Sequence, residues 1–147
     1  MTAAKTPSPD RPVLVLGATG KTGRRVAAIL QSKGVPVRRG SRAATPPFDW
    51  NDESGWGACL TGVRAAYITY TPDLAIPGAT DAIAAFVARA RHLGVERLVL
   101  LSGRGEPEAQ ACERIVQGSG LAWTVVRASW FHQNFSEGAF VDMVRAG

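Results

Sequence analysis

Residues 13–23 read Val-Leu-Val-Leu-Gly-Ala-Thr-Gly-Lys-Thr-Gly, and this stretch decides the fold class. Four branched apolar residues stop at Gly17, and an amphipathic segment begins after two further glycines at intervals of three. A strand, a glycine turn and a helix in this order are typical of the first βαβ unit of a dinucleotide-binding fold. Gly17 permits the tight turn, Gly20 lets the backbone approach a pyrophosphate, and Gly23 lets the helix pack closely on the sheet.

The charges at the start of this predicted helix also point to an anion site. Lys21, Arg24 and Arg25 lie there, and no acidic residue does. The N-terminus of a helix carries a partial positive charge that favours a nearby anion. Because this end lacks an anion of its own, we predict that ligand phosphates bind at its amide groups. The alternative is an ordinary glycine-rich loop between a strand and a helix.

Length and composition indicate a single globular domain. The chain has 147 residues, of which 46% are hydrophobic and 20% charged, which excludes a disordered chain. No apolar run approaches the roughly 20 residues of a membrane span, and the N-terminus lacks the apolar core of a signal peptide. Cys59 and Cys112 stand apart without metal-binding or redox spacing. We therefore expect a cytoplasmic protein with reduced thiols, no metal site and no membrane partner.

The net charge of +5 hides an uneven distribution. Residues 11–48 contain eight basic residues and no carboxylate, so this span carries +8 and the rest of the chain −3. A basic patch can indicate nucleic-acid binding. Since this one surrounds a predicted phosphate-binding turn, a small polyphosphate explains it more simply, and we expect no nucleic-acid partner.

The pattern along the chain predicts a flexible leader over residues 1–12 and one nucleotide-binding domain over 13–147. Strands are expected at 13–16, 35–39, about 48–50, 65–70, 97–102 and 122–127. Helices are expected at 21–33, from a cap at Asp52 or Ser54 to about 60, at 79–93, 107–117 and about 135–145. This alternation predicts an α/β fold: a doubly wound parallel sheet of about six strands, order 3-2-1-4-5-6, with helices on both faces. No segment resembling a second lobe follows, so we expect the C-terminal substrate region to be absent.

The end of the second strand predicts which dinucleotide binds. In NAD-binding folds a carboxylate about 20 residues after the glycines binds the ribose 2′-hydroxyl. Here residues 38–42 read Arg-Arg-Gly-Ser-Arg. The planar guanidinium of Arg42 and the hydroxyl of Ser41 suit a 2′-phosphate. We therefore predict NADP(H) in preference to NAD(H), with a merely solvated basic face as the alternative.

The sequence resembles the NmrA-like family of atypical short-chain dehydrogenases/reductases over nearly all of residues 13–140. The resemblance rests on several short motifs that are specific in combination. They are Gly-Ala-Thr-Gly-Lys-Thr-Gly at 17–23, Gly-Ser-Arg at 40–42, Leu-Leu-Ser-Gly at 100–103, Glu113, Ser-Gly-Leu-Ala-Trp-Thr-Val-Val-Arg at 119–127, Trp130-Phe131 and Asn134-Phe135.

This resemblance implies a Rossmann-type NAD(P) domain and a smaller C-terminal region that completes a substrate cleft. Family members include NADPH-dependent quinone and isoflavone-type reductases, and also redox sensors that bind the dinucleotide without turnover. The implied cofactor contacts run from the pyrophosphate to the nicotinamide. They are Gly17, Thr19, Gly20, Lys21, Thr22 and Gly23 at the pyrophosphate, Ser41 and Arg42 at the 2′-phosphate, Asp49 and Trp50 at the adenine, Thr69, Tyr70 and Thr71 at the central ribose, and Ser102 and Gly103 near the nicotinamide.

The sequence lacks the tyrosine–lysine pair that carbonyl-reducing short-chain reductases use for proton transfer. The fourth residue after Tyr67 is Thr71, the fourth after Tyr70 is a leucine, and no lysine follows Lys33. No catalytic residue is therefore assigned. Hydride transfer to a quinone needs no such pair, because the cofactor carries the chemistry and the hydroquinone anion is a tolerable product.

Two functions follow as hypotheses. The first is an NADPH-dependent oxidoreductase that transfers hydride to a quinone or similar small electrophile. Arg104, Trp130 and His132 would lie on the substrate side, since they follow strands at the carboxyl edge of the sheet. The second is a non-catalytic NADP(H) sensor that regulates a protein partner. Alanine-rich helix faces at 79–93 and 106–117 could also support a homodimer. Trp56 and Trp123 are predicted to lie in the core. For Glu113, an ion pair on the solvent-exposed surface is the alternative to a functional role.

Overall fold

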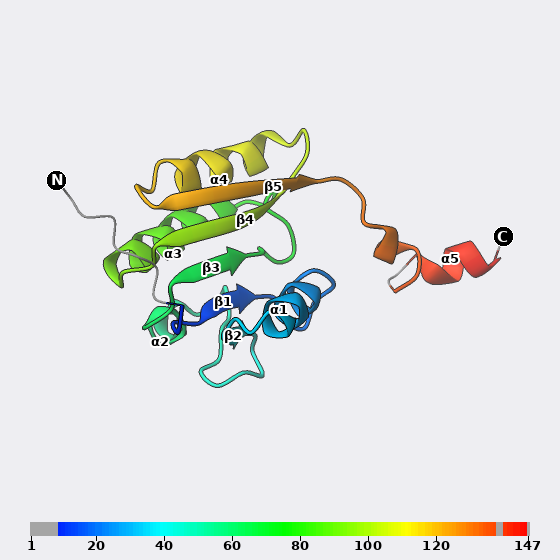
Figure 1. Cartoon of the computed structure of the whole chain (residues 1–147). Coiled ribbons are helices and arrows are strands. Elements are labelled where there is room, and N and C mark those ends of the chain that lie inside the picture. The colour runs from blue at the N-terminus through cyan, green and yellow to red at the C-terminus, as the bar shows by residue number, and fades with distance from the viewer. Residues whose placement is uncertain (1–8, 138–139, 147) are drawn as a thin grey trace.

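The computed structural model describes residues 9–137 and 140–146, so residues 1–8 of the predicted leader lie outside it. Five parallel strands form one sheet in the order β2-β1-β3-β4-β5 (Figure 1). They are β1 (Val13–Leu16), β2 (Val37–Gly40), β3 (Ala65–Ile68), β4 (Arg97–Gly103) and β5 (Ala122–Ala128). The predicted α/β fold with a doubly wound parallel sheet is confirmed.

Helices connect these strands and cover the sheet unequally. They are α1 (Gly23–Ser32), α2 (Trp56–Leu60) after the short 3-10 helix η1 (Glu53–Gly55), α3 (Ala79–His92), α4 (Pro107–Gln117), the 3-10 helix η2 (His132–Asn134) and α5 (Val141–Ala146). The larger core lies between the sheet and α2, α3 and α4, and a smaller one lies under α1 on the opposite face. Among the described residues no helix is long and apolar enough to span a membrane.

The strand expected near 48–50 does not form, so the sheet has five strands and not six. Asp49 makes only an isolated bridge with Asp52, where the chain turns back on itself. The Asp52 side chain accepts a hydrogen bond from the Ser54 amide at 3.1 Å, which confirms the predicted cap. The two rings that suggested a strand, Phe48 and Trp50, instead pack against Trp56 and Phe86 on α2 and α3, with ring centroids 5.4–5.9 Å apart. Burial of these rings in the core, rather than pairing with β2, therefore decides the local structure.

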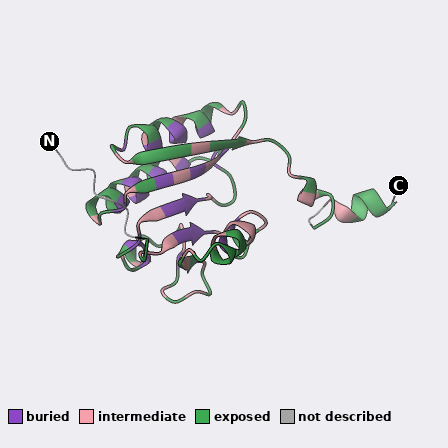
Figure 2. Cartoon of the chain, viewed as in Figure 1, coloured by how far each residue is buried: buried purple, intermediate pink, exposed green. Residues whose placement is uncertain are grey.

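The C-terminal region also differs from the prediction. In place of one helix over 135–145, the described residues form η2 and α5, and positions 138–139 lie outside the described part. Trp123 is 45% exposed, because β5 is the edge strand and is largely open to solvent (Figure 2). The prediction that Trp123 lies in the core is wrong. The same prediction for Trp56 is confirmed, since its side chain is 1% exposed.

Candidate functional site: a glycine turn beside an open pocket

The glycine turn between β1 and α1 has the close contacts that its spacing predicted. Gly17 adopts a φ of +60°, and a Cβ there would lie 2.5 Å from the Thr69 hydroxyl oxygen. A Cβ on Gly23 would overlap the carbonyl group of Gly17, so the start of α1 lies directly against the turn. The Gly20 amide donates to the Gly17 carbonyl at 2.9 Å and closes the turn. A larger residue at Gly23 would therefore push α1 away from the end of β1, and one at Gly17 would collide with Thr69, which follows β3.

Backbone amides at this end of α1 are available to a ligand. No described residue accepts a hydrogen bond from the amides of Thr19, Lys21 or Thr22. The helix has no side-chain cap and no acidic residue in its first turn. Unpaired amides at a helix N-terminus, together with the helix dipole, favour an anion. The turn thus has the donors that a pyrophosphate requires.

The cations around the turn, however, already have partners within the chain. Lys21 Nζ donates to Asn134 Oδ1 at 2.8 Å, and Arg25 Nη2 to Glu137 Oε1 at 2.6 Å, while Arg24 pairs with the other carboxylate oxygen of Glu137. The expectation that this end of α1 lacks an anion from its own chain is therefore wrong. The sequence does not reveal this contact, because the partners lie more than 110 positions apart.

The end of β2 lies beside the glycine turn. The Gly40 carbonyl accepts from the Ala18 amide at 3.3 Å, and a Cβ on Gly40 would lie 2.6 Å from a methyl group of Leu16. This contact puts Ser41 and Arg42 next to the turn. Arg42 is exposed and forms no ion pair with the described residues.

The two arginines before Gly40 point elsewhere. Arg38 donates to the carbonyls of Cys59 and Thr61, and Arg39 donates to Gln31. Both guanidinium groups thus have partners elsewhere in the chain, whereas Arg42 makes no side-chain hydrogen bond or ion pair with the described residues.

A pocket of about 520 Å³ opens at the carboxyl ends of β3, β4 and β5, the edge at which α/β sheets bind ligands. Its wall combines predicted residues with several that the sequence reasoning missed. The predicted ones are Thr69, Tyr70, Ser102, Gly103, Arg104 and Trp130, and the missed ones include Asp73, Leu74, Glu106, Phe131 and Asn134. Thr69, which lines the pocket, also lies against Gly17, so the pocket and the glycine turn are neighbours.

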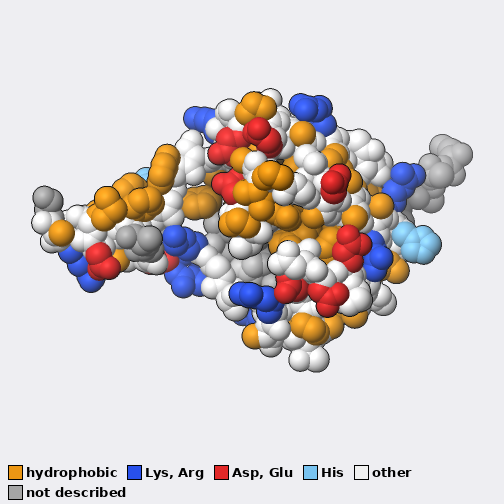
Figure 3. Space-filling view, turned by 180° about the vertical axis from the view of Figure 1, so that it is seen from behind, with side chains coloured by type: hydrophobic (Ala, Val, Ile, Leu, Met, Phe, Trp, Pro, Cys, Tyr) orange, Lys and Arg blue, Asp and Glu red, His pale blue; other side chains and the backbone are white. Residues whose placement is uncertain are grey.

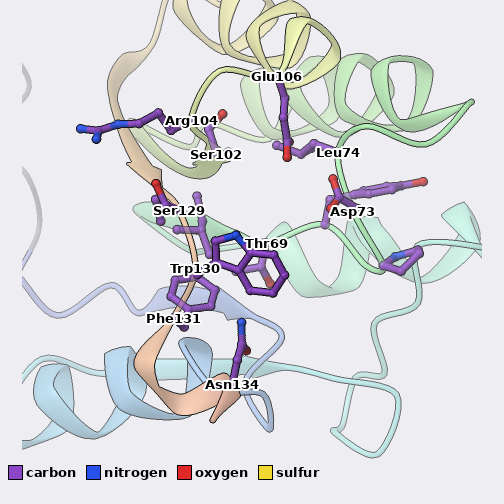
Figure 4. Close-up of a pocket in the computed structure, with 15 residues that line it drawn as sticks. Thr69, Asp73, Leu74, Ser102, Arg104, Glu106, Ser129, Trp130, Phe131 and Asn134 are labelled. Atoms are coloured by element: carbon purple, nitrogen blue, oxygen red, sulfur yellow. The ribbon is translucent and has the colours of Figure 1, made fainter. Parts of the chain in front are cut away.

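Figure 4 shows how the polar side chains lie around this pocket. Glu106 extends into it from the N-terminus of α4, Asp73 lies on the loop across from it, and the Arg104 guanidinium points away. The Glu106 carboxylate lies against Gly103, where a Cβ would collide with it. The sequence did contain a signal for Glu106. It directly precedes Pro107, the first residue of the helix predicted after β4, and therefore lies near the carboxyl edge of the sheet.

Ser102 takes part in a buried polar network rather than facing the pocket as a free hydroxyl. Its Oγ donates to Glu113 Oε1 at 2.7 Å, and Arg127 donates to the same carboxylate at 2.7, 3.0 and 3.2 Å. Glu113 is only 2% exposed. The hydrogen bonds from Arg127 hold the pKa of Glu113 below its usual value, against the effect of burial. Glu113 is therefore a buried partner of Arg127 and not a solvent-facing one.

The remaining predicted residues lie around these two features. Trp50 is half-buried and its Nε1 donates to the Thr69 carbonyl at 3.0 Å, which ties the aromatic cluster to the pocket wall. Asp49 accepts from the Trp56 indole through its carbonyl at 2.7 Å. Thr71 directly follows Tyr70, and His132 is exposed, but neither lines the pocket.

Comparison with known proteins shows which proteins this chain is similar to. The chain is 30% identical over 155 residues to festuclavine dehydrogenase easG of Aspergillus fumigatus, covering 90% of this chain and 52% of that protein. It is 29% identical over 143 residues to an NAD(P)H azoreductase of Xenophilus azovorans, covering 83% and 49%. The resemblance to the NmrA-like atypical short-chain dehydrogenases/reductases is confirmed. No protein-family model matches the chain.

Solved structures of NAD(P)-dependent proteins share the fold of this NmrA-like chain. The triphenylmethane reductase of Citrobacter sp., complexed with NADP(H), superimposes with a TM-score of 0.62 at 19% identity, covering 92% of this chain and 55% of that one. The chain spans about half the length of the curated relatives it matches. It is thus similar to the N-terminal part of proteins that include NAD(P)-binding oxidoreductases.

Proposed function

We propose that this NmrA-like chain binds NADPH and, as an oxidoreductase, transfers hydride to a quinone or similar small electrophile. The observation that carries the proposal is the position of the unpaired amides of Thr19, Lys21 and Thr22 beside an open pocket. Thr69 lies against Gly17 and also lines the pocket, so one extended dinucleotide could bind at the turn and reach the pocket.

The residues present fit such a cofactor. The turn has no side chain at Gly17, Gly20 or Gly23, so a pyrophosphate can approach the backbone amides closely. Ser41 and Arg42, beside the turn, offer a hydroxyl and a free guanidinium to a 2′-phosphate. No carboxylate is present in this segment to bind the 2′-hydroxyl of NAD, which supports NADPH as the preferred form.

The pocket suits a planar acceptor. Trp130 and Phe131 form an aromatic wall, and Leu74 adds apolar surface. Aromatic walls favour flat rings through stacking. When bound, the cofactor would supply the hydride, and the protein would orient the acceptor against it. The absence of a lysine after position 33 fits an acceptor that needs no tyrosine–lysine proton relay.

A binding titration tests the cofactor assignment. NADPH is expected to bind at least tenfold more tightly than NADH, since one charge-assisted contact contributes about 1.5–3 kcal/mol, or roughly ten- to a hundredfold. Arg42→Ala should remove this preference, whereas Lys33→Ala, which removes an exposed cation at the far end of α1, should keep it. Equal affinity of the unaltered chain for both cofactors would contradict the assignment.

A second candidate function is an NADP(H) sensor without turnover. It is favoured by the Ser102 hydroxyl, whose proton is committed to Glu113 and so is not free for an acceptor. Oxidation of NADPH in the presence of a panel of quinones separates the two functions. Turnover that Trp130→Ala weakens through a higher KM would support the oxidoreductase, and tight binding without turnover would favour the sensor.

A further inference from the structure

A short segment after β5 connects the two halves of the candidate site. We call residues 129–137 the strap. Trp130, Phe131 and Asn134 on the strap line the pocket, and Glu137 lies at the N-terminus of α1. In Figure 3 apolar side chains gather on the projecting C-terminal region, and basic side chains lie where it meets the body.

Three polar contacts hold the strap to the body of the protein. These are Lys21 with Asn134 at 2.8 Å, Arg25 with Glu137 at 2.6 Å, and Arg24 with Glu137. Within the described residues, the other hydrogen bonds of the strap are local ones between its own backbone groups, such as the Glu137 amide to the Gln133 carbonyl. The position of this pocket wall thus depends on cations of the cofactor-binding turn.

These cations lie where a cofactor phosphate would approach. Side chains on a helix tilt toward its N-terminus, so Arg24 and Arg25 extend toward the glycine turn. Arg25 Nη1 also donates to the Lys21 carbonyl at 2.7 Å, which holds its guanidinium over the turn. Three cations face one carboxylate there, and Glu137 supplies the negative charge that the first turn of α1 lacks.

We propose that Glu137 occupies the cationic end of α1 in place of a cofactor phosphate, and that NADPH displaces it and releases the strap. This inference rests on the proposed cofactor function and adds a regulation to it. Binding of the dinucleotide then frees the segment that carries Trp130 and Phe131, so this wall of the pocket can adjust to an acceptor after the cofactor is in place.

The ion pairs of Glu137 with Arg24 and Arg25 are weak enough for a cofactor phosphate to displace. The side chains of Arg24, Arg25 and Glu137 are 49%, 41% and 31% exposed. Ion pairs this exposed are weak and screened by salt. A dinucleotide that also bonds to the unpaired backbone amides has more partners at the turn than one carboxylate does. The hydrogen bond from Arg25, with the charges of Arg24 and Lys21, keeps the pKa of Glu137 low, so the Glu137 carboxylate is charged near neutral pH.

The test compares the full chain with Glu137→Gln, which keeps the size of the side chain and removes its charge. NADPH is expected to bind Glu137→Gln about two- to fivefold more tightly, the range that one weak surface ion pair can produce. Asp142→Asn, which removes an exposed carboxylate from α5 in the same region, is the matched control and should bind as the unaltered chain does. Unchanged or weaker binding by Glu137→Gln would overturn the inference.

Limited digestion with chymotrypsin gives a second readout on the strap itself. NADPH should speed cleavage after Phe131 and Phe135 in the unaltered chain, and Glu137→Gln should be cleaved faster without cofactor. Slower cleavage with NADPH would mean that the cofactor closes the strap, which contradicts the proposal. If neither chain binds NADPH, the proposed cofactor function fails and this inference with it. If both bind equally, the inference alone fails.

Discussion

Replacing Glu113 with glutamine tests the buried network behind the pocket. Glu113 is 2% exposed and accepts hydrogen bonds from Ser102 and from both Nε and Nη2 of Arg127. Glutamine keeps the size and one acceptor oxygen, so the bond from Ser102 can survive while the charged bonds to Arg127 are lost. Hydrogen bonds to charged groups contribute about 1.5–3 kcal/mol. Because Arg127 is 56% exposed and regains water, we expect the lower part of this range, about 2 kcal/mol.

The loss should depend on pH in a definite direction. Arg127 holds the pKa of Glu113 in the folded protein below the ordinary value of 4.5. Its stabilisation is therefore complete above pH 4.5 and disappears as the pH falls through the lowered pKa of the folded state. The difference in unfolding free energy between the two proteins should be largest at pH 7 and shrink below pH 4.5. In Arg127→Met, Glu113 stays buried without the guanidinium group. Its pKa should then rise, and its contribution to the unfolding free energy should change with pH in the opposite direction.

Urea unfolding at several pH values measures this difference. At pH 7 the expected loss corresponds to a fall in Tm of roughly 4–8 °C for a chain of this size. Glu108→Gln, on the exposed face of the same helix, is the control and should cost less than about 1 kcal/mol. A Glu113→Gln protein within about 0.5 kcal/mol of the original at pH 7, or a difference that does not change with pH, would refute the reasoning.

Three further predictions concern the turn, the cofactor and the core. Gly23→Ala should weaken NADPH binding more than tenfold in a fluorescence titration, because its methyl group collides with the carbonyl group of the turn. Gly57→Ala in α2, where the nearest atom would lie 3.9 Å from the added methyl group, should leave binding unchanged. Arg42→Ala should bring the ratio of the NADPH and NADH dissociation constants close to one, and an unaltered ratio would remove this residue from the 2′-phosphate site. Phe86→Ala should lower the free energy of unfolding by about 3–5 kcal/mol, because the ring is fully buried among three other aromatic rings, and a loss below about 1 kcal/mol would show that the cluster collapses around the gap.

The sequence alone determined the fold class and the place of the glycine turn. Strand, glycine turn and helix are local patterns, since burial period, φ preference and capping depend on neighbours within a few positions. For this reason β1, α1 and the cap at Asp52 were predictable within a few residues. The Rossmann topology followed because strands that alternate with helices must pair in parallel by crossovers of one hand.

Tertiary structure decided what surrounds that turn. Phe48 and Trp50 have the alternation of a strand, but the rings of Trp56 and Phe86 draw them into the core. Glu113 looks in sequence like any helical surface carboxylate, and only the packing of α4 on β4 and β5 buries it beside Ser102 and Arg127.

The contact of Glu137 with Arg24 and Arg25 depends most fully on the tertiary structure. It joins residues 112 and 113 positions apart, so no local pattern encodes it. The attraction between these charges acts only once the sheet has brought the end of β5 to the same edge as the start of α1, because exposed charges farther apart than about 10 Å are screened by salt. Local sequence therefore predicts the amides that can bind a phosphate, and the folded chain alone determines which of its own groups compete for that place.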